Sequence, residues 1–298
     1  MRCEIARIIP VLISAMISYS SLAQTPSLPN VTNAPAGPVQ ALKLGWLSFP
    51  AADSQDTPAA PNDADSSGQF ENKGLVRRGV QRTLQDQKGL YLAPLQRSNL
   101  GWDALLLAGT GALIATDRHI ERHLPGGNVN LYSNASNIAL SGTAGALAII
   151  WGYGLKTHNE QLKETGALAI ETLVNTFLVY APMQFIAGRQ RPGEGNGYGD
   201  FGRHHMINTS FPAGHPMFTM GMATVIAHEY PRPWVKILAY GATAAVIAGR
   251  FLGRDHWASD VFVGPALGYF IGSHIFHSRC NPELSEDCHR PAHGRDQP

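Results

Sequence analysis

The 298-residue sequence is poor in charge. Charged residues make up 15% of the chain, against roughly 25% in an average soluble domain. The formal net charge is only +1, which argues against nucleic acid as a partner, because such binding depends on a strongly basic surface. So few charges indicate either a very apolar core or contact with a membrane.

Cysteine is equally scarce. Of the three cysteines, Cys280 and Cys288 lie in a polar C-terminal stretch, and no histidine motif surrounds either of them. In an oxidising compartment the two could close a short loop, and two unpaired thiols are the alternative. The adjacent pair His204–His205 has no carboxylate or cysteine set nearby, so loop histidines fit it better than a metal site. The sequence therefore predicts neither a metal nor a cofactor.

Strand-like alternation is also missing. After Gly101 come six apolar segments, each long enough for a helix and separated by proline and glycine. The segments span residues 102–117, 136–155, 163–188, 213–229, 233–250 and 257–277. The sequence therefore predicts an all-α fold, an up-and-down bundle of about six core helices over residues 100–277.

The remaining residues divide into four parts. Residues 1–23 combine a basic start, a short apolar run and a small-residue cleavage site, which predicts a secretory signal peptide, cleaved or retained as an anchor. Residues 24–73 are rich in Pro, Ala and Ser and predict a disordered linker. Residues 74–99 predict a peripheral helical segment, and 278–298 a loose polar tail. We expect an exported protein, periplasmic or associated with the cell-envelope membrane.

Not all of the apolar segments suit a membrane crossing. A spanning helix needs about 20 apolar residues, and residues 137–155 meet this requirement. The fourth segment is short, the fifth carries Lys236 and the sixth carries Asp260, which suits buried helices better. If every segment crossed the membrane after an exported N-terminus, the polar clusters described next would face the cytoplasm. This conflict favours a periplasmic protein, soluble or membrane-associated.

Three polar clusters interrupt the apolar segments. They span residues 184–192, 211–215 and 249–260, at the end of the third helix, the start of the fourth and the junction of the fifth and sixth. Because neighbouring helices of an up-and-down bundle are antiparallel, these ends meet at one end of the molecule. The sequence therefore predicts a single site built from all three clusters.

The residue types in these clusters suit a phosphate group. Arg191 and Arg250 offer planar forks of donors, and Gly214 lies at a helix N-terminus, which attracts anions. His256 and Asp260 are four residues apart, so they share a helix face, and the carboxylate would orient the imidazole for attack. His215 would protonate the leaving oxygen. Taken singly, the histidines and arginines also fit ordinary helix-end roles.

The three clusters resemble the motifs of the type 2 phosphatidic acid phosphatase superfamily, which includes vanadium haloperoxidases. The family's motifs are Lys, six residues, Arg-Pro; Pro-Ser-Gly-His; and Ser-Arg, five residues, His, three residues, Asp. The matching residues here are Arg191-Pro192, Gly214-His215, Arg250, His256 and Asp260. The resemblance implies a phosphohistidine on His256, a proton donor in His215, and Asp260 orienting His256.

Three motif positions depart from the family pattern. Gln184 replaces the lysine, Ala213 the serine of the second motif and Gly249 the serine of the third. Gln184 would still donate to phosphate from its amide, but without charge. The loss of one such donor costs roughly 2–4 kcal/mol in other enzymes.

The sequence therefore predicts a metal-independent phosphatase acting on phosphate monoesters through a phosphohistidine. Lipid phosphates are the expected substrate class, and soluble monoesters remain open. Two alternatives share the site: a non-catalytic relative that binds phosphate or lipid, and a vanadate-dependent haloperoxidase.

Overall fold

The computed structural model describes the backbone of residues 66–289, and the predicted signal peptide lies outside this range. Within it the chain forms seven α-helices, two short 3-10 helices and no strand, which confirms the predicted all-α fold. The α-helices are α2 (Ser66–Leu92), α3 (Leu100–Arg122), α4 (Val129–Thr157), α5 (Glu160–Ala187), α6 (Gly214–Glu229), α7 (Pro233–Leu252) and α8 (Ala258–Arg279). The 3-10 helices are η1 (Ala93–Leu95) and η2 (Glu286–His289).

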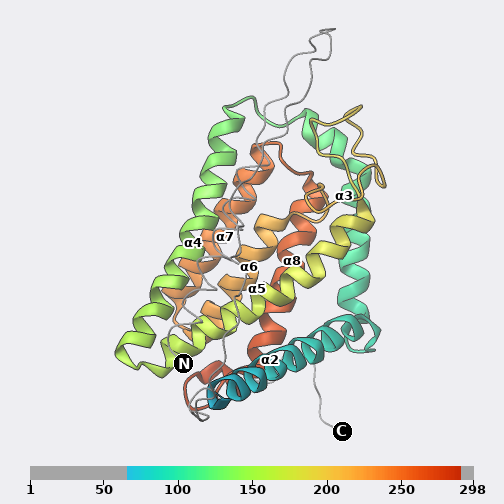
Figure 1. Cartoon of the computed structure of the whole chain (residues 1–298). Coiled ribbons are helices and arrows are strands. Elements are labelled where there is room, and N and C mark those ends of the chain that lie inside the picture. The colour runs from blue at the N-terminus through green and yellow to red at the C-terminus, as the bar shows by residue number, and fades with distance from the viewer. Residues whose placement is uncertain (1–65, 290–298) are drawn as a thin grey trace, which may run out of the picture.

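Helices α3 to α8 are the six predicted core segments, and they run alternately up and down (Figure 1). Helix α2 lies across the end of the bundle at which α3 begins (Figure 1). It starts at Ser66, within the stretch 24–73 for which a linker is expected. Hydrogen bonds from Gln87 Nε2 to the Asn175 side chain (2.7 Å) and backbone attach α2 to α5.

Local signals set the helix boundaries. Asn128 and Asn159 cap α4 and α5, each side chain accepting a hydrogen bond from the amide three residues on. Gly188 ends α5 in a left-handed conformation, φ 53°, which glycine adopts without steric cost. Pro233 begins α7, where its missing N–H is not needed.

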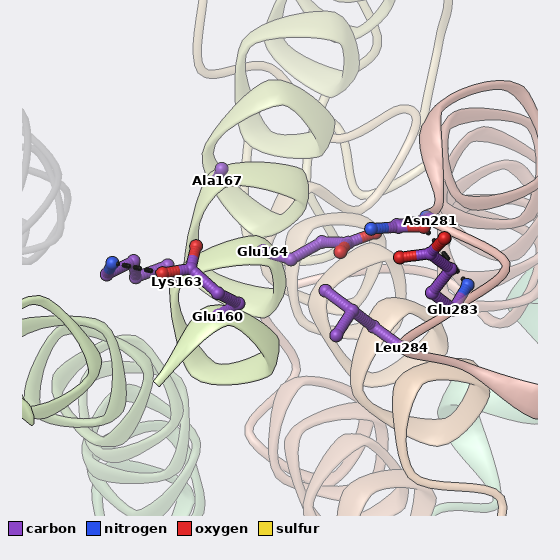
Figure 2. A pocket seen from close by; sticks show the side chains of 7 residues that line it. All are labelled: Glu160, Lys163, Glu164, Ala167, Asn281, Glu283 and Leu284. Atoms are coloured by element: carbon purple, nitrogen blue, oxygen red, sulfur yellow. Dashed lines mark hydrogen bonds and ion pairs between the residues drawn. The ribbon is translucent and has the colours of Figure 1, made fainter. Parts of the chain in front are cut away.

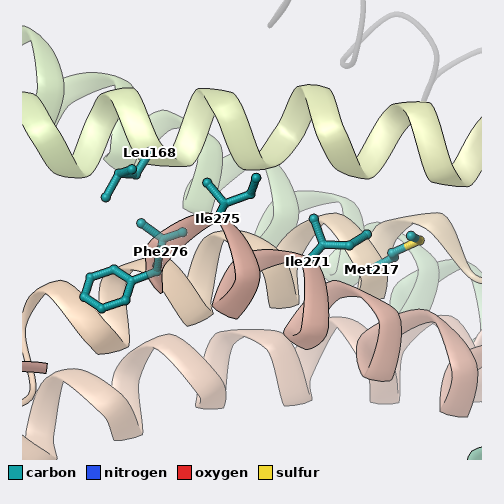
Figure 3. Packing of buried hydrophobic residues seen from close by; sticks show 6 residues of the cluster. Leu168, Met217, Ile271, Ile275 and Phe276 are labelled. Atoms are coloured by element: carbon teal, nitrogen blue, oxygen red, sulfur yellow. The ribbon is translucent and has the colours of Figure 1, made fainter. Parts of the chain in front are cut away.

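The core lies between α5, α6 and α8. Figure 3 shows its buried apolar side chains, which interdigitate across the three helices. The members are Leu168 from α5, Met217 and Val225 from α6, and Ile271, Ile275 and Phe276 from α8. This packing fixes α6 against α8, the two helices whose first turns carry His215 and Asp260.

A glycine stripe allows α6 and α8 to approach closely. Gly264, Gly268 and Gly272 recur every four residues and face the backbone of α6. A Cβ on Gly268 would lie 2.2 Å from the carbonyl oxygen of Met217, and one on Gly264 would lie 2.4 Å from that of Ala213. Larger residues here would push the two helices apart, as in other small-residue helix interfaces.

The outer helices expose much apolar surface. On α4, Ile138 is 72% exposed and Ile149 is 74% exposed, and large apolar side chains are exposed on α5 and α7 as well. Helices α4, α5 and α7 are long and apolar enough to cross a membrane. Besides the stretch 137–155 in α4, helices α5 and α7 therefore also meet the length and composition of a spanning helix. Lys236 does not exclude α7, because it lies in the first turn of that helix.

The start of the C-terminal segment is ordered rather than loose. Cys280 and Cys288 form a disulfide, so the paired alternative is the one the structure adopts. Ser285 Oγ donates to the carbonyl of His228 at 3.0 Å, and Asp287 forms an ion pair with Lys236 at 3.4 Å. These contacts attach η2 to the ends of α6 and α7, which the polar composition of the segment did not reveal.

Candidate active site

The three polar clusters meet at one end of the bundle, where α5 and α7 end and α6 and α8 begin. His215, from α6, is close enough to His256, Arg191 and Arg250 to be influenced by their charges. Burial, followed by these three positive or ionisable neighbours, holds the pKa of His215 well below its usual value of 6.5. The predicted antiparallel order therefore does bring these four side chains together.

His256 is buried and firmly oriented. Its Nδ1 lies 2.7 Å from the carbonyl oxygen of Ser210, whereas the nearest oxygen of Asp260 is 3.8 Å away. A carbonyl only accepts hydrogen bonds, so Nδ1 must carry the proton and Nε2 keeps a free lone pair. The nitrogen that was expected to be held by Asp260 is thus held first by a backbone carbonyl.

Asp260 organises the residues around His256. One of its oxygens accepts hydrogen bonds from the amide of Trp257, at 2.8 Å, and from the hydroxyl of Ser210. The other forms an ion pair with Arg189 at 2.7 Å. Asp260 is therefore fully buried with its acceptors occupied, and it fixes the segment whose carbonyl orients His256.

The two arginines predicted to bind phosphate share one acidic neighbour. Arg250 donates to the carboxylate of Asp255 at 2.9 Å, and Arg191 reaches the Asp255 carbonyl at 3.3 Å. The second nitrogen of each guanidinium binds an asparagine, Asn208 for Arg191 and Asn137 for Arg250. These bonds hold both forks in place beside the two histidines, as a preformed anion site requires.

The first turn of α6 faces this cluster. Helix N-termini carry backbone N–H groups without partners inside the helix, and in α6 these include the amides of Gly214 and His215. Pro216 comes next, at a position where a missing N–H is harmless. Among the described residues, His215 Nε2 is buried and has no hydrogen-bond partner, so it is free to bond with a ligand.

Gln184 is engaged elsewhere. It is fully buried, its Nε2 donates to the carbonyl of Pro212 at 2.7 Å, and its Oε1 accepts from Thr209. The amide thus links the end of α5 to the segment that precedes α6. The prediction that Gln184 binds phosphate gains no support from this geometry, which assigns the side chain a structural task.

The third departure from the family pattern has a steric reason. Gly249 lies against α4, and a Cβ at this position would be 2.7 Å from the Cβ of Ser136 and 2.8 Å from the carbonyl of Tyr132. A serine would not fit without moving α4. Ala213 is also fully buried, and its backbone amide donates to the carbonyl of Asp260 at 3.2 Å.

Sequence reasoning missed Asp117, Ser210 and Asp255, and it considered Arg189 only as a substitute phosphate donor. Asp117 and Arg189 form a buried ion pair at 2.7 Å behind Asp260, and Ser210 and Asp255 hold the histidine and the arginines. An acidic residue at the end of an apolar segment was the one available sign of Asp117. Among the described residues, no group of three or more His, Cys, Asp or Glu side chains is placed to hold a metal ion.

A separate pocket of about 440 Å³ opens at the other end of α5 (Figure 2). Its lining residues are Glu160, Lys163, Glu164, Ala167, Asn281, Glu283 and Leu284. Three carboxylates against one ammonium repel an anion. This pocket is therefore unsuited to phosphate, and the histidine cluster remains the candidate active site.

Comparison with known proteins agrees with this assignment. Residues 165–281 match the sequence model of the PAP2 superfamily. A lipid A 1-phosphatase from Porphyromonas gingivalis is 34% identical over 65 residues, which cover 21% of this chain and 15% of that protein. No solved structure matches the chain. The matched range contains all three polar clusters, so the part of the chain that carries the candidate active site is similar to the PAP2 superfamily.

Proposed function

We propose that the protein is a metal-independent phosphatase that removes phosphate from lipid phosphates through a phosphohistidine on His256. One observation carries the proposal: the Nδ1 of His256 faces the Ser210 carbonyl, which leaves Nε2 as a nucleophile. Arg191, Arg250 and His215 lie beside it. The match to the PAP2 superfamily model and the similarity to a lipid A 1-phosphatase support the same class of reaction.

In the first step the lone pair of His256 Nε2 attacks phosphorus, and the bond from phosphorus to the ester oxygen breaks. Arg191, Arg250 and the amides at the start of α6 stabilise the phosphoryl oxygens as charge develops on them. The leaving oxygen takes a proton from His215, whose Nε2 has no partner within residues 66–289. The products are the free alcohol and a phosphohistidine.

In the second step water attacks the phosphohistidine. His215, now neutral, accepts a proton from the water, and the bond between phosphorus and nitrogen breaks. Its electron pair returns to Nε2 of His256, and inorganic phosphate leaves. The Ser210 carbonyl stays bonded to Nδ1 throughout, so the imidazole needs no reorientation between the steps.

The surface around the bundle supports a lipid phosphate as the substrate. Three of the described helices are apolar and long enough to cross a membrane, and their exposed apolar side chains favour contact with lipid. A lipid phosphate would present its headgroup to the site while its chains remain in the bilayer. Soluble phosphate esters are the second candidate class, and a direct comparison separates the two.

Export is part of the proposal. The N-terminal pattern predicts a signal sequence, and a disulfide such as Cys280–Cys288 persists in oxidising compartments. Fractionation of cells and N-terminal sequencing of the mature protein test this point. A mature chain beginning at Gln24 is the expected result for cleavage, and a protein found in the cytosolic fraction contradicts export.

The non-catalytic alternative has specific support. Gln184 is tied to the fold and Ala213 lacks a hydroxyl, so two phosphate donors of the family motif are missing. Phosphate binding without turnover would favour this alternative. Halide oxidation that requires added vanadate would favour the haloperoxidase.

The experiment that tests the proposal is phosphate release, with chelator present, from phosphatidate in detergent micelles and from a soluble aryl phosphate. The wild type and His256→Ala are compared, with circular dichroism to confirm that both are folded. We expect chelator-resistant release by the wild type and none by the variant. Release that persists in His256→Ala would overturn the mechanism.

A further inference from the structure

We propose that Asp117, on α3, is a positioning residue of the active site, which acts with Arg189 to fix Asp260 and to set the charge behind His256. The inference rests on the proposed function. Asp117 lies outside the range that matches the PAP2 superfamily, residues 165–281. Helix α3 would therefore supply a residue that positions the active site, although the helix lies outside the matched range.

The geometry places Arg189 between two carboxylates. Its Nη2 donates to Asp117 at 2.7 Å, and its Nη1 donates to Asp260 at 2.7 Å and to the hydroxyl of Ser259 at 2.6 Å. Its Nε donates to the carbonyl of Gly199 at 3.2 Å. The guanidinium, only 2% exposed, is thus fixed by partners on three separate segments.

Asp117 also anchors the start of α8. It accepts hydrogen bonds from both the amide and the hydroxyl of Ser259, the amide at 3.0 Å. Asp260 is the next residue, and it lies four residues after His256. Asp117 therefore binds the two groups that hold Asp260: its cation, Arg189, and its helix turn.

Burial of this cluster has an electrostatic consequence. Asp117 is 1% exposed and Asp260 is fully buried, so two carboxylates share one guanidinium and leave an excess of one negative charge. With Asp117 present, Arg189 is divided between two partners and neutralises Asp260 only in part. Some of the negative potential at Asp260 then reaches the imidazole of His256, 3.8 Å away.

Other charged groups surround His256. Those that act on it directly are Asp260 on α8, His215 on α6, Arg250 on α7 and Arg191 after α5. Arg189 and Asp255 form ion pairs with Asp260 and Arg250. Arg191 and Arg250 favour the neutral imidazole, and Asp260 favours the charged one. The excess negative charge supplied by Asp117 adds to the effect of Asp260. It raises the pKa of His256 above the value that the imidazole would have without Asp117.

Three variants separate charge from packing. Asp117→Asn removes the excess charge at nearly constant volume. Asp117→Asn combined with Arg189→Gln removes one charge of each sign and restores the original net charge. Ser259→Ala removes a hydroxyl that bonds to both partners but leaves every charge in place, so it serves as the matched control.

The pKa of His256 is measured by NMR on the full chain labelled at histidine, with His256→Asn to assign the signal. This readout does not depend on turnover, and the acidic limb of kcat/KM is recorded alongside it. We expect Asp117→Asn to lower the pKa of His256 by about 0.5–1 unit. The double variant is expected to return within about 0.3 unit of the wild type on the same charge argument, and Ser259→Ala to leave the pKa in place.

The proposal would be overturned if the pKa of His256 were unchanged in folded Asp117→Asn, or if Ser259→Ala shifted it equally. Asp117 would then only cap the start of α8. The same conclusion follows if neither Asp117 variant folds while Ser259→Ala does. Failure of the phosphatase assignment has a different signature, because the wild type would then release no phosphate while the NMR titration still reports the charge effect.

Discussion

His256 Nδ1 lies 2.7 Å from the carbonyl oxygen of Ser210, closer than it lies to the carboxylate of Asp260. A backbone carbonyl cannot be removed by substitution, and it cannot change its charge with pH. The orientation of the proposed nucleophile therefore depends on the path of the chain at Ser210. Asp260 stabilises that path by accepting the hydroxyl of the same serine.

Substitution of Asp260 is expected to be far more damaging than substitution of Ser210. In Asp260→Asn the amide must point a donor at either Arg189 or the Trp257 amide, since both carboxylate oxygens already accept hydrogen bonds. We expect a loss of about 3 kcal/mol in stability or more, as for other broken buried pairs. Ser210→Ala keeps the carbonyl and should cost about 1 kcal/mol.

Denaturant unfolding and kcat/KM, measured in parallel on the two variants, check this order. Asp260→Asn should lose at least about 100-fold in kcat/KM, the scale of a lost preorganised contact. Equal effects of the two substitutions would contradict the dominant role of the carboxylate.

Activity is expected to be highest at acidic pH. Burial lowers the pKa of both His256 and His215 below 6.5. The nucleophile must be neutral, so activity rises as pH increases through the pKa of His256. The proton donor must be charged, so activity falls as pH increases through the pKa of His215, and kcat/KM should peak below pH 6.5.

The comparison of wild type with His215→Gln isolates the donor. An alkyl phosphate has a poor leaving group that needs protonation, and its own ionisation near pH 6 is common to both proteins. The variant should have a lower kcat/KM. In its profile of kcat/KM against pH, the decrease at high pH that is caused by deprotonation of His215 should be absent. A peak above pH 7 in the wild type would contradict the assignment.

The glycine stripe predicts a sharp difference between two glycine-to-alanine substitutions. In Gly268→Ala the new Cβ would meet the Met217 carbonyl at 2.2 Å, so α6 and α8 must separate, at a cost of about 1–3 kcal/mol or more. Gly241→Ala, within α7, meets nothing within 4 Å and should stabilise the helix by about 0.5–1 kcal/mol. Thermal unfolding of both variants provides the test, and equal melting temperatures would show that the close approach is unimportant.

Glu229, at the end of α6, is expected to make the folded state less stable as pH rises. Its side chain is fully buried, and neither carboxylate oxygen has a hydrogen-bond partner among the described residues. Burial, helped by the charge of Glu164, raises the pKa of Glu229 to about 8. Because the folded pKa exceeds the unfolded value, the folded state loses stability as pH rises from about 4.5 to 8.

In Glu229→Gln this loss should disappear. The variant is expected to match the wild type at pH 5 and to be more stable by about 2–4 kcal/mol at pH 8. Glu283→Gln, an exposed position nearby, serves as the control and should change stability little at either pH. A variant with the same stability difference at both pH values would show that Glu229 is not buried as a neutral acid.

Much of the fold could be predicted from hydrophobic periodicity and breakers. The six core segments required only length, apolar character and the proline or glycine between them. Which helices lie at the outside of the bundle could not be predicted in this way, because α6 and α7 have similar apolar composition. Only the packing partners of α6, including the glycine stripe of α8, place it inside and leave α7 outside.

The candidate site was predictable where residues stand at fixed spacing. His256 and Asp260 share one face because they are four apart, and helix order brings His215 and the arginines to the same end. Asp117 was not predictable, because its partner Arg189 is distant in sequence and the pair exists only through tertiary packing. The hydrogen bonds of Gln184 to the segment before α6 were not predictable for the same reason, because its partners lie in a loop without regular spacing.

The central claim is a covalent phosphohistidine on His256, and its most direct test is to trap that intermediate. The protein is mixed with a lipid phosphate labelled in the phosphoryl group, quenched in alkali within milliseconds, and digested to locate the label. The account predicts alkali-stable, acid-labile label on the peptide that contains His256, and none in His256→Ala. Turnover by the wild type without label on that peptide would contradict the account.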